Sequence, residues 1–353
     1  MDEKVTIKSI AKASGFSIGT IDRALNDRGR IKLETKEKIL SIADQLGYKP
    51  NKLASALSKN QTIRLVAVFP FEPDYYYQKI KDGMLDAQNE LNEYSIQLDF
   101  FHPESLEPKT QIEMLANINK LDLNGLILSP GDDSLDKLIN SFVDHGIPTV
   151  TIANDTPTSK RLFYIGQNMY RAGMLGGELI GKLLSGRGNV LTLIAFSTVY
   201  SLEKRYLGFE DMIKKEYPNI QIIGPYEFHD WDNVAHNIVA NAIANEEIDG
   251  IFVASAAGTV GAARALEEST LLKKPVLVGY DDVAYIKEMI KAGIIHATIT
   301  QDPYSQGFYS VKLLAKNIVE GWLPKEDELF TSLQVLMKSN IDDLDFVKNL
   351  DNF

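Results

Sequence analysis

Residues 5–58 read VTIKSIAKASGFSIGTIDRALNDRGRIKLETKEKILSIADQLGYKPNKLASALS, and this stretch determines how the chain begins. Its apolar residues recur every three or four positions, which is the spacing of helices that bury one face. Gly15 interrupts the first run, and Ser17 is suited to cap the next helix. The pattern predicts three short helices over about 7–14, 18–26 and 34–46. The tight turn between the first two is typical of a helix-turn-helix motif.

The charges of the 353-residue chain are distributed unevenly, although the formal net charge is −11. Residues 1–60 hold 12 Lys and Arg against 7 Asp and Glu, a net charge of +5, and the remaining residues carry −16. A basic head on an acidic body lets the head meet phosphate while the body is repelled. The asymmetry therefore favours a nucleic-acid-binding head.

The pattern changes after residue 62 to an alternation of strand-like runs and helical segments. The runs are IRLVAVFP, IQLDFF, GLILSP, PTVTIA, NVLTLIAF, IQIIGPYEF, GIFVAS, PVLVGY and HATITQ. This alternation predicts two doubly wound α/β lobes with parallel sheets over residues 62–340. We expect the all-α head at 1–49, a linker at 50–61 and a C-terminal tail at 341–353. Ligands of such sheets bind beyond the carboxyl ends of the strands.

Several function classes are disfavoured by the composition. The chain has no cysteine, which excludes a disulfide scaffold and fits a reducing compartment. Its first residues contain acids and no apolar signal segment, and no run approaches a membrane span, so we expect a cytoplasmic protein without membrane contact. The segment GGELIGKL has Leu183 where a phosphate-binding loop needs Ser or Thr, and no metal-binding histidine spacing occurs. We expect no cofactor, no metal and no enzyme activity.

The head closely resembles the DNA-binding head of the LacI/GalR family. The matching features occur in the family's order: V-T-I-x-x-I-A, a G-F-S turn, T-I-D-R-x-L-N, T-K-E-K-I, L-G-Y-K-P-N and a final A-x-x-L. The body resembles the periplasmic binding protein type I fold which that family carries, so the resemblance covers nearly the whole chain. It implies a transcription regulator whose DNA affinity changes when a small effector alters lobe closure. Repression released by an inducer is the default, and corepression and activation remain open.

The resemblance implies a set of DNA contacts. Ile18, Gly19 and Arg23 would face base edges in the major groove, and the Arg23 fork matches guanine. Asp22 stands where the family commonly has Ser; capping, pairing near Arg23 and reading a cytosine amine all remain open. The residues expected to bind or position DNA are Thr6, Ser17, Ile18, Gly19, Thr20, Arg23, Asn26, Asn51, Ala54 and Leu57.

The linker resembles the family's hinge helix, which forms on operator DNA. Leu57 would wedge between central base pairs in the minor groove, and Ala54 would permit close approach to it. A wedge of this kind needs two symmetric hinges, so the resemblance implies a homodimer on a near-palindromic operator. The tail has apolar residues at a spacing of three but is too short for several heptads, which favours a dimer over a coiled-coil tetramer.

The resemblance also places effector contacts on the loops after the strands. The positions are Asp155, Arg161, Arg205, Trp231, Ser255, Asp281 and Gln301. A sugar needs carboxylate acceptors, Arg or Gln donors and an aromatic plate, and this set supplies all three. Ser255 replaces a commoner Asn, and Asn168 a commoner Asp. These departures suggest a different or larger ligand, or one with a charged group met by Arg161 and Arg205.

Two other classes compete with a regulator. A solute-binding receptor for transport would share the body but would require export, and it would not need the head. An enzyme on an α/β scaffold would turn over its bound ligand. Paired acids such as Asp132 and Asp133 are present, but no nucleophile and base accompany them.

Overall fold

The computed structural model describes residues 7–25, 31–45, 62–70, 75–92, 94–104, 108–118 and 122–343. The chain divides into two compact units, Met1–Gln61 and Thr62–Phe353, which we call the head and the body and describe separately. The predictions for Thr6, Asn26, Asn51, Ala54, Leu57 and the tail beyond residue 343 lie outside the described residues.

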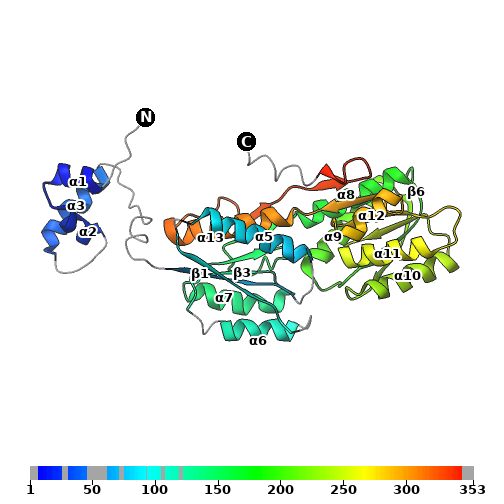
Figure 1. Cartoon of the computed structure of the whole chain (residues 1–353), viewed down its shortest axis with the longest axis horizontal. Helices are drawn as coiled ribbons and strands as arrows, with labels where there is room; N and C mark the ends of the chain where they lie inside the picture. The colour runs from blue at the N-terminus through cyan, green and yellow to red at the C-terminus, as the bar shows by residue number, and fades with distance from the viewer. Residues whose placement is uncertain are drawn as a thin grey trace. The chain divides into compact units, whose positions relative to one another are not determined.

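The described part of the head contains three helices, drawn in blue in Figure 1: α1 (Ile7–Ser14), α2 (Ile18–Leu25) and α3 (Leu33–Gln45). The predicted turn is confirmed, because Gly15 has φ +72° and the Ser17 Oγ accepts the Thr20 backbone N–H at 3.3 Å. The side chains that are buried between the helices are those of Ile10, Ile21, Ala24, Ile39 and Ala43.

The first lobe of the body is a sheet of parallel strands in the order β11-β5-β4-β3-β1-β2. The strands are β1 (Ile63–Val68), β2 (Ile96–Phe101), β3 (Gly125–Leu128), β4 (Thr149–Ile152), β5 (Phe163–Gly166) and β11 (Glu328–Phe330). Helices α5 (Tyr75–Glu90) and α13 (Pro303–Glu320) cover one face; α6 (Pro108–Ile118) and α7 (Asp136–Asp144), which follows the short 3-10 helix η1 (Asp133–Leu135), cover the other (Figure 1).

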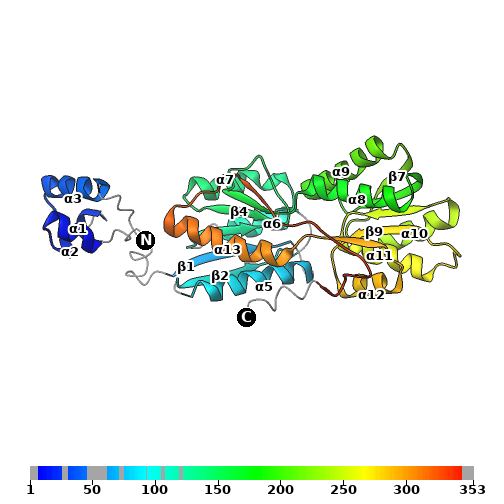
Figure 2. The same cartoon turned by 90° about the horizontal axis from the view of Figure 1, so that it is seen from above.

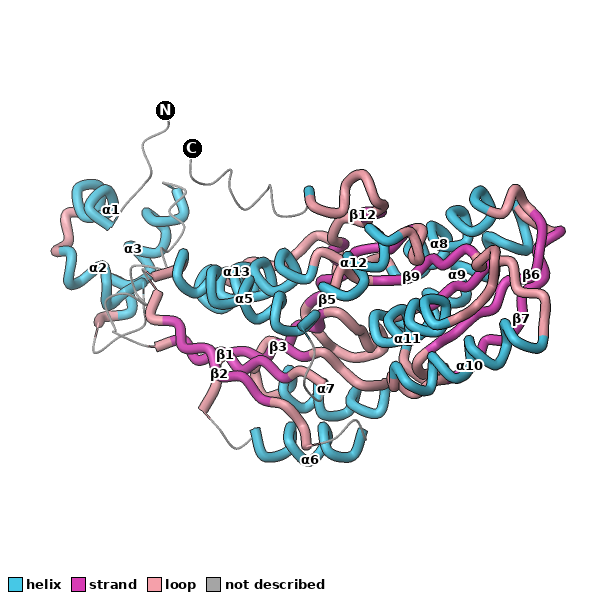
Figure 3. Tube along the Cα trace, turned by 45° about the vertical axis from the view of Figure 1, so that its right-hand side comes forward, coloured by secondary structure: helices cyan, strands magenta, loops and turns pink. Residues whose placement is uncertain are grey.

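The second lobe has the order β12-β10-β9-β8-β6-β7, with β12 antiparallel at the edge. Its strands are β6 (Arg187–Ile194), β7 (Asn219–Glu227), β8 (Gly250–Val253), β9 (Val276–Tyr280), β10 (Ala297–Thr300) and β12 (Gln334–Leu336). Helices α8 (Met169–Leu183) and α9 (Tyr200–Glu216) pack on one face, and α10 (Asp232–Asn245), α11 (Ala256–Glu268) and α12 (Ala284–Ala292) on the other (Figure 3).

Strand β8 shows why the predicted runs are apolar throughout. Side chains alternate between the two faces of a strand, and both faces of this sheet are covered by helices. Ile251 and Val253 therefore enter the core formed with α10, α11 and α12, while Phe252 enters the core formed with α8 and α9.

The chain passes between the lobes three times: from β5 to α8, from β10 to α13, and from β11 to β12 (Figure 2). All nine predicted runs are strands, but β5, β11 and β12 were not predicted. Strands β11 and β12 have three residues each, which is too short for a periodic signal, and they pair with β5 and β10. Strand β5 has four residues, as the predicted β3 does, and its run FYIG was not recognised. The loops at the three crossovers form the hinge of the body.

Helices α8 and α9 approach each other closely because glycines stand at their contact. A Cβ on Gly173 would lie 1.8 Å from the Arg205 backbone oxygen, and one on Gly208 would lie 2.0 Å from the Tyr170 oxygen. Both positions exclude any larger residue without a shift of backbone. This close contact fixes the position of α9, and with it the Arg205 side chain.

Candidate functional site

The exposed face of α2 presents the predicted DNA-contacting residues of the head. Ile18 is 51% exposed, and Ser17, Gly19 and Arg23 are exposed beside it. Arg23 Nε donates to the Gly19 oxygen at 3.0 Å, which leaves its terminal nitrogens directed away from the helix backbone contact. A helix with this face outward can enter a major groove, since its polar side chains are not used in the head's core.

The buried arginine Arg205 contacts both loops that lead from β5 and from β10 to the other lobe. Arg205, on α9, is only 3% exposed, and among the described residues no carboxylate lies within ion-pair distance of it. Its NH1 nitrogen donates to the Ala254 oxygen, and its guanidinium lies 4.0 Å from the centre of the Tyr280 ring. Its Nε has no hydrogen-bond partner in the described part of the chain. A buried cation held only by neutral groups is suited to bind a polar ligand.

Three further side chains extend from Arg205 along the hinge. Its NH2 nitrogen donates to Gln301 Oε1 at 3.0 Å and to Gln167 Oε1 at 3.1 Å. Gln301 Nε2 in turn donates to Asp281 Oδ1 at 2.7 Å, and Gln167 Nε2 donates to the Thr300 oxygen at 3.3 Å. We call Arg205, Gln167, Gln301 and Asp281 the Arg205 cluster. It joins two of the three crossovers and brings together three of the predicted effector residues.

Asp155 and Arg161, two other predicted effector residues, form a buried ion pair in the first lobe. Arg161 donates to both Asp155 oxygens at 2.6 and 2.7 Å, and both side chains are 2% exposed. Arg161 also donates to the Asp327 oxygen at 2.9 Å, which ties the loop before β11 to β4. Desolvation lowers the pKa of Arg161, but the hydrogen bond and charge of Asp155 outweigh it and raise the pKa. Their role in effector binding stays a prediction.

Trp231 and Ser255 lie on neighbouring loops of the second lobe. Trp231 precedes α10 and is 59% exposed, so its ring is available to a ligand or to solvent. The Ser255 Oγ donates to Asp230 Oδ1 at 3.3 Å, and Ser255 directly follows Ala254, which binds Arg205. The loop that carries Trp231 is therefore joined to the strand end beside the Arg205 cluster.

Two direct contacts hold the lobes together away from the hinge. Lys79 on α5 donates to both Asp282 oxygens at 2.7 and 2.6 Å, and Asp282 directly follows Asp281 of the cluster. The Ser201 backbone N–H at the start of α9 donates to Asn154 Oδ1 at 3.0 Å. The structure thus has the lobes in contact around the cluster.

Sequence reasoning missed Gln167 and Tyr280. Gln167 follows β5, a strand that was not predicted, so nothing marked it as a strand-end residue. Tyr280 belongs to a predicted strand, but its contact with Arg205 depends on the packing of α9 against the sheet. Burial raises the pKa of Tyr280 well above its usual value, so the hydroxyl stays protonated.

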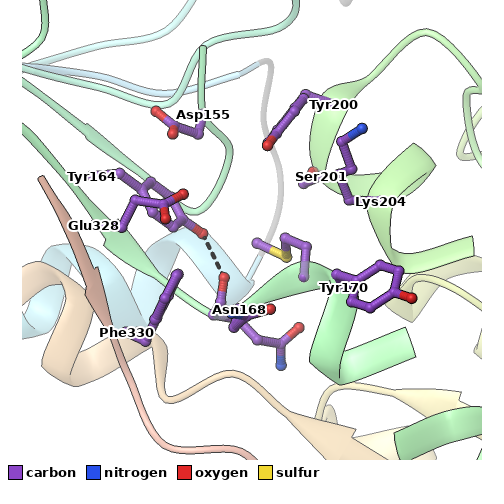
Figure 4. Close-up of a pocket in the computed structure, with 11 residues that line it drawn as sticks. Asp155, Tyr164, Asn168, Tyr170, Tyr200, Ser201, Lys204, Glu328 and Phe330 are labelled. Carbon is purple, nitrogen blue, oxygen red and sulfur yellow. Dashed lines mark hydrogen bonds between the residues drawn. The ribbon is translucent and has the colours of Figure 1, made fainter. Parts of the chain in front are cut away.

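A cavity of about 200 Å³ lies beside the hinge, lined from both lobes (Figure 4). Asp155 is the one predicted effector residue in its lining, and Gln167 of the Arg205 cluster forms part of its wall. Arg205, Asp281 and Gln301 are not among its lining residues, so this cavity is separate from the site that those three define.

A helix-turn-helix head on a two-lobed body with a polar cluster between the lobes defines a class of ligand-responsive transcription regulators. Residues 6–51 match the model of bacterial regulatory proteins of the lacI family, and residues 65–321 match the periplasmic binding protein domain. The chain belongs to the LacI family and is a DNA-binding transcription regulator. The resemblance found in the sequence is confirmed, as is the fold class.

Relatives of both kinds cover most of the chain. The ribose operon repressor of Bacillus subtilis is 24% identical over 321 residues, which is 88% of this chain and 90% of the repressor. The ribose import binding protein RbsB of Haemophilus influenzae is 24% identical over 281 residues, 77% of this chain and 92% of that protein. The solved structure of GanP, a glucose-galactose binding protein from Geobacillus stearothermophilus, is 25% identical with a TM-score of 0.74, covering 80% of this chain and 99% of GanP.

The match to the lacI family model favours the regulator over the transport receptor, because the head is the part that receptors do not need. In the described part of the chain, no helix combines the length and hydropathy needed to cross a membrane. The same residues contain no group of three or more His, Cys, Asp or Glu arranged to hold a metal ion.

Proposed function

We propose that this regulator represses transcription from a near-palindromic operator and that a sugar or sugar derivative, bound at the Arg205 cluster, releases it. The observation that carries the proposal is the buried Arg205 guanidinium, which is held by neutral acceptors and whose Nε donor has no partner among the described residues. The regulator would act in the cytoplasm, where its operator is found.

The chemistry of the cluster favours a neutral polyol. Arg205 supplies donors, Asp281 supplies acceptors, and Gln301 supplies both, which suits hydroxyl groups that donate and accept at once. The relatives named for ribose and for glucose and galactose support the same ligand class. Trp231 and Ser255 would contact the ligand from the second lobe.

Coupling to DNA would run through the lobes. A ligand that touches both lobes favours the arrangement in which they meet. We expect this to change the position of the first strand of the body, to which the linker and the head are attached. The effect expected on operator affinity is a coupling free energy of about 1–3 kcal/mol. The head would act as a pair of copies in a homodimer, with Arg23 reading a base in each half-site.

A ligand screen tests the effector proposal. Aldopentoses, aldohexoses, polyols and sugar phosphates are tested for a rise in melting temperature, because a ligand of the folded state stabilises it. We expect a sugar to raise the melting temperature and Arg205→Met to abolish the rise. Arg171→Met is the matched control, since Arg171 is an exposed cation on the neighbouring helix α8.

A selection from random duplexes tests the DNA proposal. The purified protein should enrich a sequence with two-fold symmetry, bind it with a steep salt dependence, and sediment as a dimer. Binding should weaken when the sugar from the first screen is added. A monomer with no preference among duplexes would contradict the proposal.

A further inference from the structure

The hinge cavity, defined above as the space of about 200 Å³ lined from both lobes, is a candidate for a second ligand site. It is smaller than the ~300–1,000 Å³ of pockets for drug-sized ligands, so its occupant would be a small metabolite. Aromatic side chains of both lobes line it, including Tyr164, Tyr200 and Phe330. They offer apolar faces for the body of such a molecule.

Opposite charges stand on the two sides of the cavity (Figure 4). The Glu328 side chain, on β11 of the first lobe, forms no hydrogen bond or ion pair with any described residue. The Lys204 ammonium, on α9 of the second lobe, lies 3.8 Å from its sequence neighbour Glu203 and 5.3 Å from the centre of the Tyr200 ring. The Lys204 and Glu203 side chains are both partly exposed, so their ion pair contributes little to stability. Desolvation and the nearby Asp155 raise the pKa of Glu328, an effect that an added cation beside it would oppose.

A ligand with charges at both ends fits these walls better than a neutral sugar does. Glu328 is exposed and the Lys204 side chain is 36% exposed, and a ligand with opposite charges would pair with both, whereas a polyol offers a charge to neither. An ammonium group would meet Glu328 beside Tyr164, whose ring face also attracts cations, while the Tyr200 ring already faces the Lys204 ammonium at 5.3 Å. A carboxylate would meet Lys204 and the Ser201 hydroxyl, at the N-terminal turn of α9.

We propose that the hinge cavity binds a small zwitterion of amino-acid size, with its ammonium on Glu328 and its carboxylate on Lys204. The two charges come from different lobes, so the bound molecule would favour the lobe arrangement described here. Gln167 belongs both to the cavity wall and to the Arg205 cluster, so a zwitterion here would lie next to the proposed sugar site without sharing its charged residue.

Calorimetric titration of the full-length protein tests this site. The probes are the proteinogenic L-amino acids, β-alanine, γ-aminobutyrate and glycine betaine, each compared with the matching amine and the matching carboxylic acid. We expect at least one zwitterion to bind, its single-charge analogues to bind at least tenfold more weakly, and both Glu328→Gln and Lys204→Met to weaken it at least tenfold. Glu326→Gln and Lys325→Met, exposed neighbours outside the cavity, should leave its affinity unchanged.

Three outcomes would overturn the proposal. One is that no zwitterion binds. A second is that the bound zwitterion is lost in Arg205→Met but kept in Lys204→Met, which would place it in the sugar site. The third is that Glu328→Gln weakens the binding of a monosaccharide but of no zwitterion, which would make the cavity part of a sugar site. None of these depends on whether a sugar binds at the Arg205 cluster, since that is measured with Arg205→Met and sugars alone.

Discussion

Arg161 and Arg205 are both buried, yet their charges are balanced in different ways. Arg161 meets the Asp155 carboxylate through two short bonds, while Arg205 meets carbonyl and amide oxygens and an aromatic ring. The sequence placed both on loops after strands and could not separate these roles, because a charge partner is set by tertiary packing. Asp281 and Gln301 were correctly expected at strand ends of one sheet, where parallel topology brings them together. The expectation that Arg205 lies on a loop was wrong, because it lies within α9, whose packing on the sheet brings it to them.

At the residue scale, Asp155→Asn should destabilise the body strongly. The substitution leaves the buried Arg161 guanidinium with only the exposed Asp327 carboxylate, at 3.4 Å, as a counter-charge. Breaking a buried pair typically costs about 3–5 kcal/mol of unfolding free energy. Asp144→Asn is the matched control, because its pair with Lys160 is exposed and contributes about 0–1 kcal/mol. Urea unfolding followed by circular dichroism measures both. Equal losses in the two variants would contradict the assignment of the Asp155 pair as structural.

At the scale of elements, the sequence pattern predicted the three head helices and nine of the strands. It failed for β5, β11 and β12, whose three or four residues are ordered by partners across the sheet. Failure at β5 also hid Gln167, since a residue is recognised as a strand-end contact only when its strand is recognised. The rejection of GGELIGKL as a phosphate-binding loop agrees with the structure, because the segment lies within α8, where Gly176 packs on Phe252 and Gly177 on Met212 of α9.

Gly208→Ala should separate α8 from α9. The new Cβ would overlap the Tyr170 oxygen, so backbone must move, and overpacking of this kind costs about 1–3 kcal/mol or more. The shift would also move Arg205, three residues earlier on the same helix, and weaken effector binding. Lys214→Ala, exposed on the last turn of α9, should change neither quantity. Chemical unfolding and calorimetry of sugar binding measure the two effects.

Arg23→Ala should weaken and broaden operator binding. If Arg23 of α2 forms a bidentate contact with guanine, the loss is about 1–3 kcal/mol at that base pair, with effector affinity unchanged. Lys38→Ala, an exposed cation on α3, serves as the control and should reduce affinity evenly across sequences if at all. Fluorescence anisotropy against operators altered at each position gives the result. A variant that binds and discriminates like the parent would refute the docking of α2.

At the scale of the whole molecule, the body works as two lobes joined by a hinge and by a small number of direct contacts. The Lys79–Asp282 pair is the charged one among those described above. Lys79 is 42% exposed while Asp282 is nearly buried, so salt screens the pair only in part. The pair therefore biases the lobes toward contact without locking them.

Lys79→Met should lower the apparent affinity for the effector. Losing a partly exposed ion pair removes at most about 1 kcal/mol, so we expect at most about a fivefold weaker sugar affinity, with the parent approaching the variant at high salt. Lys160→Met, which breaks a pair within the first lobe, should have no such effect. Calorimetric titrations of both variants at two ionic strengths measure these effects. An unchanged sugar affinity of Lys79→Met at low salt would show that the Lys79–Asp282 pair does not contribute to lobe closure.

The three crossovers have a consequence for how the protein is made. Helix α13 and strand β11, which complete the first lobe, follow the whole of the second lobe up to β10 in the chain. Chains emerge from the ribosome N-terminus first, and domains generally fold as units. The first lobe therefore cannot be completed until the second lobe has been translated. Until then β5 lacks its neighbour β11, and one face of the sheet lacks α13. A nascent chain that stops after Thr300 contains most of the second lobe but a first lobe without α13 and β11.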